Sequence, residues 1–90
     1  MSTANQTVVI TGASSGIGRA LARVYAQSGA RVGITARRRG LLDELVQEIR
    51  ARGGEVAAET ADVCDRGALH AAIDRLQQQL GPADLLIANA

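Results

Sequence analysis

The stretch VVITGASSGIGRALA, residues Val8–Ala22, decides how this chain begins to fold. Strand-favouring residues lead to Thr11, and a loop containing Gly12, Gly16 and Gly18 then runs directly into a series of helix formers. The start of a helix has unpaired N–H groups and a partial positive charge, which suit a diphosphate if the backbone can come close. Glycine has no Cβ and permits that approach, whereas a turn that serves only chain reversal is the alternative. The order strand, glycine-rich loop, helix therefore predicts a phosphate-binding turn.

The spacing of these glycines is G-x-x-x-G-x-G. It differs from the general dinucleotide pattern G-x-G-x-x-G. It also differs from the mononucleotide P-loop, which needs a Lys, because all ten basic residues here are Arg.

The composition bounds the chain to one small domain of 90 residues, with 47% hydrophobic and 21% charged residues. A net charge of +1 and a single aromatic residue do not fit nucleic-acid binding, which needs a basic surface and usually aromatic residues that stack on bases. One Cys and one His are too few for a zinc cage, so we expect no metal, and Cys64 is expected to be a small buried residue. The polar N-terminus has no secretory signal pattern, and no apolar run approaches the ~20 residues that span a bilayer. We therefore expect a cytoplasmic protein without a membrane partner.

Strand and helix signals alternate along the whole chain. The first helix is expected from Ile17 to a stop at Gly29, with Ile17, Leu21 and Val24 on its apolar stripe and Arg19 and Arg23 on the opposite face. The second helix is marked by Leu42 to Ile49, and the third by an N-cap at Asp65 and a break at Gly81-Pro82. The four expected strands are Thr7–Thr11, Ala30–Thr35, Glu55–Ala61 and Asp84–Ala90.

Strands joined by single helices predict right-handed crossovers and a parallel sheet. The fold class is therefore α/β: the N-terminal half of a Rossmann-type doubly wound sheet, βαβαβαβ, with strand order 3-2-1-4. Ligands of such sheets bind at the carboxyl ends of the strands beside the point where the order reverses. Residues 12–18 and Asn89 would meet there.

The motifs TGASSGIG, DV and a strand ending in NA resemble, in this order, the N-terminal part of a short-chain dehydrogenase/reductase. The resemblance covers essentially the whole chain. It implies that the three loop glycines, with Ile17 between the last two, surround the diphosphate of a nicotinamide cofactor. It also implies that Asp62 bonds the adenine amino group and that Val63 packs on the adenine ring, although Asp62 could merely begin a turn. Asn89 would match the Asn-Asn-Ala-Gly element that steadies the central strands, but Ala88 replaces its first Asn.

The choice of cofactor depends on the end of the second strand, where NAD-preferring folds carry an acidic residue. Ala36 occupies that position here, and Arg37 and Arg38 follow it. A carboxylate would repel a 2′-phosphate, whereas a guanidinium suits phosphate oxygens, so we expect NADP rather than NAD. The alternative is that Arg37, Arg38 and Arg39 form a solvated cluster, and Arg39 is expected to be only that.

Two serines of the loop bear on the same question. Ser14 could add a hydroxyl bond to the 2′-phosphate. Ser15 lies where some NADP-preferring relatives have a basic residue, so this second positively charged contact to the 2′-phosphate is missing.

The catalytic residues of the family, a Tyr-x-x-x-Lys pair with an upstream Ser, are not found in this sequence. Tyr25 is expected to be a packing residue and His70 a surface residue, so we assign no catalytic residue. Residues 1–90 are thus expected to be the dinucleotide-binding portion of an NADP(H)-dependent oxidoreductase whose catalytic C-terminal half is absent. Such an enzyme transfers hydride between nicotinamide and a small-molecule carbonyl or alcohol. The alternative is a stand-alone, non-catalytic dinucleotide-binding or association module.

The crossovers would place two helices on one face of the sheet and leave the third nearly alone on the other. We therefore expect exposed apolar surface and association of the isolated chain. At full length we expect a homo-oligomer.

Overall fold

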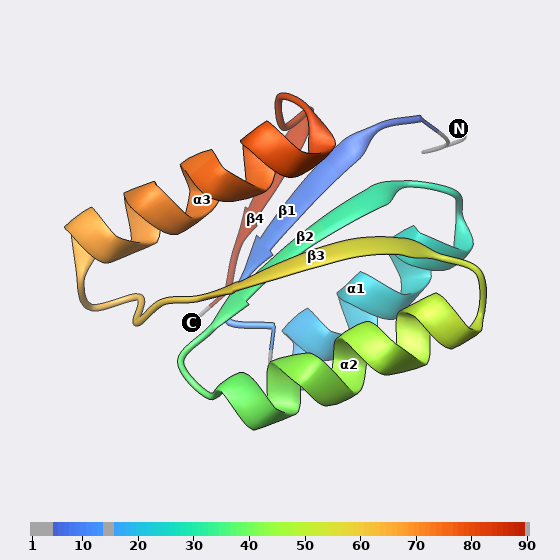
Figure 1. The fold of residues 1–90 in the computed structure, drawn as a ribbon, viewed down its shortest axis with the longest axis horizontal. Coiled ribbons are helices and arrows are strands. Elements are labelled where there is room, and N and C mark those ends of the chain that lie inside the picture. The colour runs from blue at the N-terminus through green and yellow to red at the C-terminus, as the bar shows by residue number, and fades with distance from the viewer. Residues whose placement is uncertain (1–4, 14–15, 90) are drawn as a thin grey trace.

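The computed structural model describes residues 5–13 and 16–89. Strands and helices alternate from end to end, and each helix crosses over to the next strand (Figure 1). The elements are β1 (Thr7–Thr11), α1 (Gly16–Gln27), β2 (Arg31–Ala36), α2 (Arg39–Ala51), β3 (Glu55–Thr60), α3 (Arg66–Leu80) and β4 (Leu85–Ala88). The second strand thus lies one residue later than expected, and the second helix begins three residues earlier than its apolar positions indicated.

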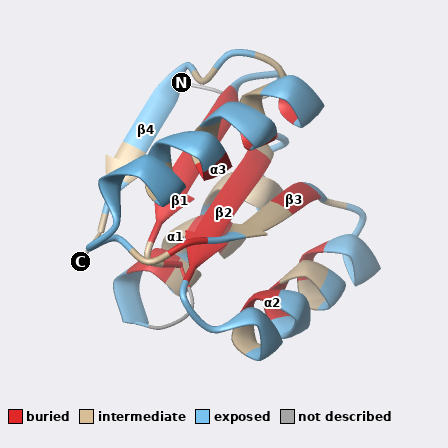
Figure 2. Ribbon diagram, turned by 60° about the vertical axis from the view of Figure 1, so that its left-hand side comes forward, coloured by how far each residue is buried: buried red, intermediate tan, exposed pale blue. Residues whose placement is uncertain are grey.

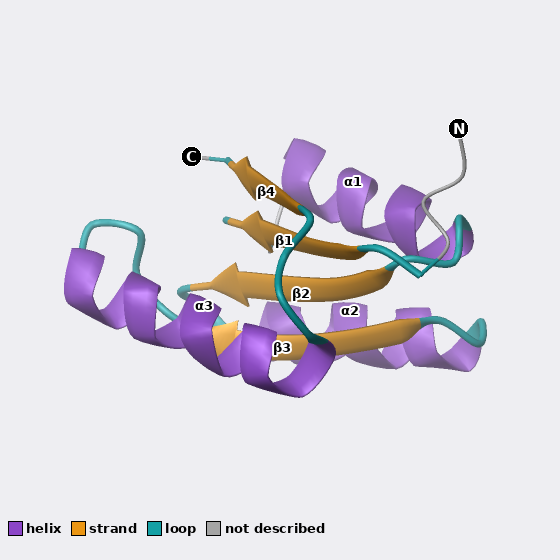
Figure 3. Cartoon of the chain, turned by 90° about the horizontal axis from the view of Figure 1, so that it is seen from above, coloured by secondary structure: helices purple, strands orange, loops and turns teal. Residues whose placement is uncertain are grey.

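The four strands form one parallel sheet in the order β3-β2-β1-β4, which confirms the predicted fold class. Seen from above, α1 and α2 cover one face of the sheet and α3 covers the other, as the crossover rule requires (Figure 3). The order reverses at β1, between β2 and β4. This reversal brings the start of α1 close to the end of the described chain.

The core has two layers, one on each face of the sheet. Alternate residues of β1 serve both layers, since Val8 and Ile10 face α1 and α2 while Val9 faces α3. Every residue of β1 is buried, which suits a central strand of a parallel sheet (Figure 2). Gly33 of β2 lies against α3, because a Cβ there would stand only 3.3 Å from side-chain atoms of Leu76 and Leu80.

The amino ends of β1 and β4 are tied together by reciprocal bonds. The amide of Thr7 donates to Asp84 Oδ2 at 2.8 Å, and the amide of Asp84 donates to the carbonyl of Thr7 at 2.8 Å. The Thr7 hydroxyl donates to the carbonyl of Leu80 at 3.1 Å. The start of β4 is therefore fixed against the centre of the sheet.

Helix ends follow the local signals in the sequence. Asp65 caps α3, because its Oδ1 accepts from the amide of Ala68 at 3.0 Å. Gly29, just after α1, has a φ of 90°, and the amide of Ala30 returns to the carbonyl of Tyr25 at 3.1 Å. Both predictions are confirmed.

The predicted apolar stripe of α1 is right at Leu21, which packs against the core, and wrong at Ile17 and Val24. Ile17 and Val24 are 71% and 56% exposed, whereas Gly18 and Ala22 are the buried residues of this helix. The helix approaches the sheet through its smallest residues, so the larger ones at its flanks remain in contact with solvent. Cys64 is exposed and is not the buried residue that we expected, because it lies in the turn before α3.

Candidate nucleotide-binding site

The glycine loop leaves the carboxyl end of β1 and is held against β2. The amide of Ala13 donates to the carbonyl of Thr35 at 2.9 Å. Gly12 has a φ of 67° and Gly16 a φ of 58°, a region that favours glycine. Ser14 and Ser15 lie outside the described residues, so their expected roles are not placed.

The three loop glycines have different surroundings. A Cβ on Gly12 would lie 2.4 Å from the carbonyl oxygen of Asn89. A Cβ on Gly18 would lie 2.6 Å from the carbonyl oxygen of Gly12 and 2.7 Å from Nδ2 of Asn89. A Cβ on Gly16 would meet no described atom within 4 Å. Gly12 and Gly18 are therefore required by the packing of the protein itself, whereas Gly16 faces open space.

Asn89 joins the end of β4 to this loop. Its side-chain Nδ2 donates to the carbonyl of Gly12 at 3.0 Å. Its amide donates to Oγ1 of Thr11 at 3.2 Å, and the Thr11 hydroxyl donates to the carbonyl of Ile87 at 3.5 Å. Loop and strand are thus locked together at the point where the strand order reverses.

Thr11 is a functional position that the sequence reasoning missed. Its hydroxyl is the only side-chain group of β1 within the described residues that bonds to the end of β4. The available signal was a polar residue at the end of a buried strand, directly before Gly12. A buried hydroxyl needs a partner, and here that partner is the backbone around Asn89.

Asp62 begins a turn after β3. Its Oδ1 accepts from the amide of Cys64 at 2.9 Å, so the structure shows the turn-forming role that we kept as the alternative. Its Oδ2 receives no hydrogen bond from the described residues, and the next residue, Val63, is 41% exposed. A free carboxylate oxygen beside an exposed apolar side chain can accept from an amino group on a flat ring.

The end of β2 carries cations and no acid. Ala36 is buried, whereas Arg37 and Arg38 are exposed and make no ion pair with the described residues. Arg38 is the N-cap residue of α2 and gives no side-chain cap bond, and the first turn of α2 contains no acidic residue. Arg39 pairs with Asp43 one turn along the helix at 3.3 Å. Two free guanidinium groups thus stand beside an uncapped helix start.

Backbone bonds connect the glycine loop, the two arginines and the Asp62 turn at the carboxyl ends of the strands. The bond from Ala13 to Thr35 fixes the glycine loop beside β2, and the amide of Ala61 donates to the carbonyl of Ala36 at 3.0 Å. Arg37 directly follows Ala36, and Asp62 directly follows Ala61. The carboxyl ends of β3, β2 and β1 are therefore followed, in this order, by the Asp62 turn, the two arginines and the glycine loop at the start of α1. Such a set can bind an anionic dinucleotide.

Within the described part of the chain, the structure gives no candidate acid–base pair at this site. Tyr25 is partly buried and packs against the core on the α1 side, and His70 is exposed on α3. No group of three or more His, Cys, Asp or Glu residues that could hold a metal occurs in residues 5–13 and 16–89. In the same part of the chain, no helix is long and apolar enough to cross a membrane.

Comparison with known proteins gives a consistent result. The sequence model described as short chain dehydrogenase matches residues 6–90. The chain is 51% identical over 81 residues to the 3-dehydrosphinganine reductase TSC10A of Arabidopsis thaliana, covering 89% of this chain and 24% of the relative. It is 41% identical over 86 residues to the oxidoreductase YxbG of Bacillus subtilis, covering 96% of this chain and 32% of the relative.

Solved structures of similar fold agree with these relatives. A hydroxysteroid dehydrogenase from Escherichia coli superposes with a TM-score of 0.94 at 31% identity, covering 99% of this chain and 38% of that one. A glucose dehydrogenase of Caenorhabditis elegans superposes with a TM-score of 0.91 at 35% identity, covering 100% and 39%. The chain therefore spans only about a quarter to two-fifths of the length of these proteins.

Proposed function

Because this chain belongs to the short chain dehydrogenase family, we propose that residues 1–90 are the cofactor-binding part of an NADP(H)-dependent oxidoreductase. The enzyme transfers hydride between the nicotinamide ring and the carbon of a carbonyl or alcohol. The names of several matching relatives, among them a ketoacyl reductase of Streptomyces violaceoruber, support a carbonyl substrate. They also favour an enzyme over a stand-alone binding module.

The observation that carries NADP over NAD is the end of β2. NAD sites place a carboxylate there to accept from the ribose 2′-hydroxyl, and Ala36 offers none. Arg37 and Arg38, which make no ion pair with the described residues, and the start of α2 supply positive charge where a 2′-phosphate would add about two negative charges. The alternative of a merely solvated cluster fits Arg39, whose charge is paired with Asp43.

The remaining residues fit the rest of the cofactor. Gly16 is open on the side where a diphosphate needs to approach, with Ile17 exposed next to it. Asp62 and Val63 suit an adenine ring, and Asn89 holds the glycine loop in place. When bound, the nicotinamide ring supplies or accepts the hydride, and these residues bind and orient the cofactor.

The general acid and base lie in another part of the enzyme, since no described residue here has the geometry for that role. We propose a cytoplasmic enzyme that acts as a homo-oligomer on a small molecule.

The test is to change Arg37→Asp and measure dissociation constants for NADPH and NADH by calorimetry. Hydrogen bonds to charged groups contribute roughly 1.5–3 kcal/mol, so we expect NADPH to bind about tenfold to a hundredfold more weakly. NADH should bind equally well or better, because the new carboxylate can accept from the 2′-hydroxyl. Arg39→Asp is the matched control, since it makes the same change of charge at a residue that we place outside the site. Equal losses for both cofactors in Arg37→Asp would refute the assignment.

A further inference from the structure

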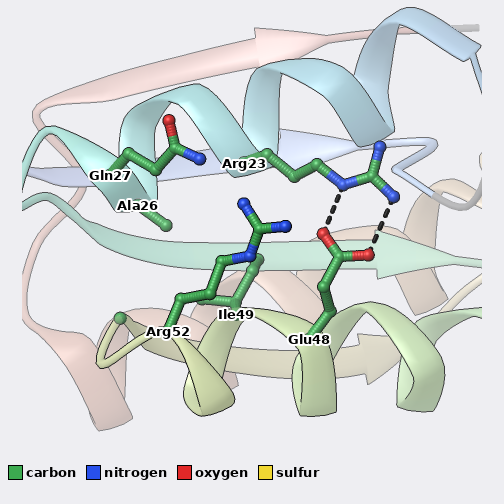
Figure 4. Close-up of a pocket in the computed structure, with 7 residues that line it drawn as sticks. Arg23, Ala26, Gln27, Glu48, Ile49 and Arg52 are labelled. Atoms are coloured by element: carbon green, nitrogen blue, oxygen red, sulfur yellow. Dashed lines mark hydrogen bonds and ion pairs between the residues drawn. The ribbon is translucent and has the colours of Figure 1, made fainter.

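An ion pair joins the middle of α1 to α2 (Figure 4). The guanidinium of Arg23 donates from Nε to Oε2 of Glu48 and from Nη2 to Oε1 at 2.9 Å. Both side chains are partly buried, with 38% and 28% exposed. Because two parallel bonds are made, the pair fixes the orientation of the two helices as well as their separation.

This pair is the one side-chain hydrogen-bonded link between α1 and α2 in residues 5–13 and 16–89. Beside it lies a shallow hollow with an apolar floor formed by Ala26, Ile49 and Gly54. A Cβ on Gly54 would stand 2.6 Å from Cγ2 of Ile49, so the chain after α2 is packed tightly there. The hollow leaves part of the space between α1 and α2 unfilled, so the ion pair is the polar contact that holds the two helices together beside it.

Each of the two helices begins at a different anion-binding group of the candidate site. Gly16 begins α1 at the glycine loop, and Arg38 occupies the N-cap position of α2 directly after Arg37. With a rise of about 1.5 Å per residue, Arg23 lies about 10 Å from the start of its helix and Glu48 about 14 Å from the start of α2. Arg38 belongs to the N-terminal end of α2, so a shift of α2 relative to α1 changes its position with respect to the loop, whereas Arg37 follows the end of β2 that the sheet holds.

We propose that Arg23 and Glu48 are positioning residues that set the distance between the diphosphate-binding loop and the 2′-phosphate-binding arginines. This inference rests on the proposed function, since it assumes that both groups hold one cofactor. A dinucleotide with a 2′-phosphate contacts both groups at once and is sensitive to their separation. A dinucleotide without the 2′-phosphate contacts the loop but not the arginines, so its affinity depends much less on the distance between them.

Glu48 is the better member of the pair to change. Arg19 and Arg52 also lie close enough for their charges to act on the Glu48 carboxylate, so either could replace Arg23 as its partner. Changing Glu48→Gln keeps the shape of the side chain and removes the negative charge that attracts Arg19, Arg23 and Arg52. An ion pair this exposed contributes little to stability, so we expect the variant to fold.

The experiment measures dissociation constants of NADPH and NADH for the chain and for Glu48→Gln. We expect NADPH to bind roughly three- to tenfold more weakly, which is the size of effect that residues outside a ligand site have on binding, and NADH to change less than twofold. Glu59→Gln is the matched control, because it removes the ion pair with Arg75 on the α3 side of the sheet. The exchange of charges in Arg23→Glu with Glu48→Arg should restore part of the lost preference for NADPH.

The outcomes separate this inference from the proposed function. If the unchanged chain prefers NADPH but Glu48→Gln weakens both cofactors equally, or neither, the positioning role is refuted and the proposed function stands. If Glu59→Gln shifts the preference as strongly, the positioning role is also refuted. If the unchanged chain shows no preference for NADPH, the proposed cofactor is wrong and the inference falls with it.

Discussion

At the scale of single residues, Asn89 and the three loop glycines depend on one another. Asn89 fills the space that side chains on Gly12 and Gly18 would occupy, and its amide group holds the carbonyl of Gly12. Gly16 has no such neighbour among the described residues. One motif therefore combines two requirements, internal packing at its ends and access for a ligand in its middle.

Alanine substitutions should separate these requirements. Gly18→Ala puts a Cβ against backbone atoms that cannot move freely, so we expect the free energy of unfolding without cofactor to fall by about 1–3 kcal/mol. Gly16→Ala introduces strain of roughly 1–2 kcal/mol at positive φ, and its Cβ also occupies the open side of the loop. Urea denaturation and an NADPH titration of both variants make the comparison. A Gly18→Ala protein as stable as the parent would contradict the packing role, and a Gly16→Ala protein with normal affinity would contradict the access role.

At the scale of elements, features set by neighbouring residues were predicted better than features set by contacts between distant residues. The cap at Asp65 and the stop at Gly29 are set by neighbouring residues, and both were predicted. The stripe of α1 was wrong at Ile17 and Val24 because periodicity counts large apolar residues, whereas the buried residues of this helix are Gly18 and Ala22.

Contacts between distant residues gave no signal in the sequence. Arg23 was expected to face solvent, but its partner Glu48 lies 25 positions away. Asn89 and Gly12 are 77 positions apart, so only the predicted strand order brought them together. The glycine loop, the arginines and Asp62 were named from motif and resemblance, and the structure shows which bonds hold them at one edge. Their part in binding a cofactor stays a prediction.

The ion pair between α1 and α2 also predicts how acid affects stability. The hydrogen bonds from Arg23 lower the pKa of Glu48 below its ordinary value of 4.5, with smaller contributions from the charges of Arg23, Arg52 and Arg19. A carboxyl group whose pKa is lower in the folded state stabilises the fold above its unfolded pKa, and this stabilisation is lost as the pH falls through the folded pKa. Glu48→Gln should therefore flatten the dependence of unfolding free energy on pH below about 4.5, measured by urea denaturation between pH 7 and 3. An unchanged slope would show that Glu48 does not contribute to acid sensitivity.

At the scale of the whole molecule, the two edges of the sheet differ. At β3, Nη2 of Arg50 donates to the carbonyl of Val56 at 3.3 Å, and Glu59 pairs with Arg75, so this side is occupied by the chain's own side chains. At β4, Leu85 and Leu86 are 39% and 52% exposed, and because their sheet partners Val8 and Val9 face opposite layers, both faces of this strand are left partly uncovered. The β4 side is thus the apolar one.

We expect the polypeptide of residues 1–90 to self-associate through this side when it is studied on its own. Light scattering coupled to size-exclusion chromatography at several concentrations would measure the association. Leu86→Lys should reduce it, because a charged side chain on an edge strand opposes pairing with another strand. A matched change at the other edge, Thr60→Lys, should leave the association as it was. A parent chain that stays monomeric at every concentration would contradict the expectation.

The reciprocal bonds between Thr7 and Asp84 also carry a consequence for the order in which the chain folds. They join residues 77 positions apart, whereas Arg31 on β2 reaches Thr7 across only 24 positions. Closing the longer loop costs about 1 kcal/mol more in chain entropy than closing the shorter one. During synthesis, β1 and β2 can therefore pair long before β4 exists, and the central strand spends that interval with one side open. The step that completes the sheet also aligns Asn89 with the glycine loop, so the loop reaches its final conformation only when the last strand docks.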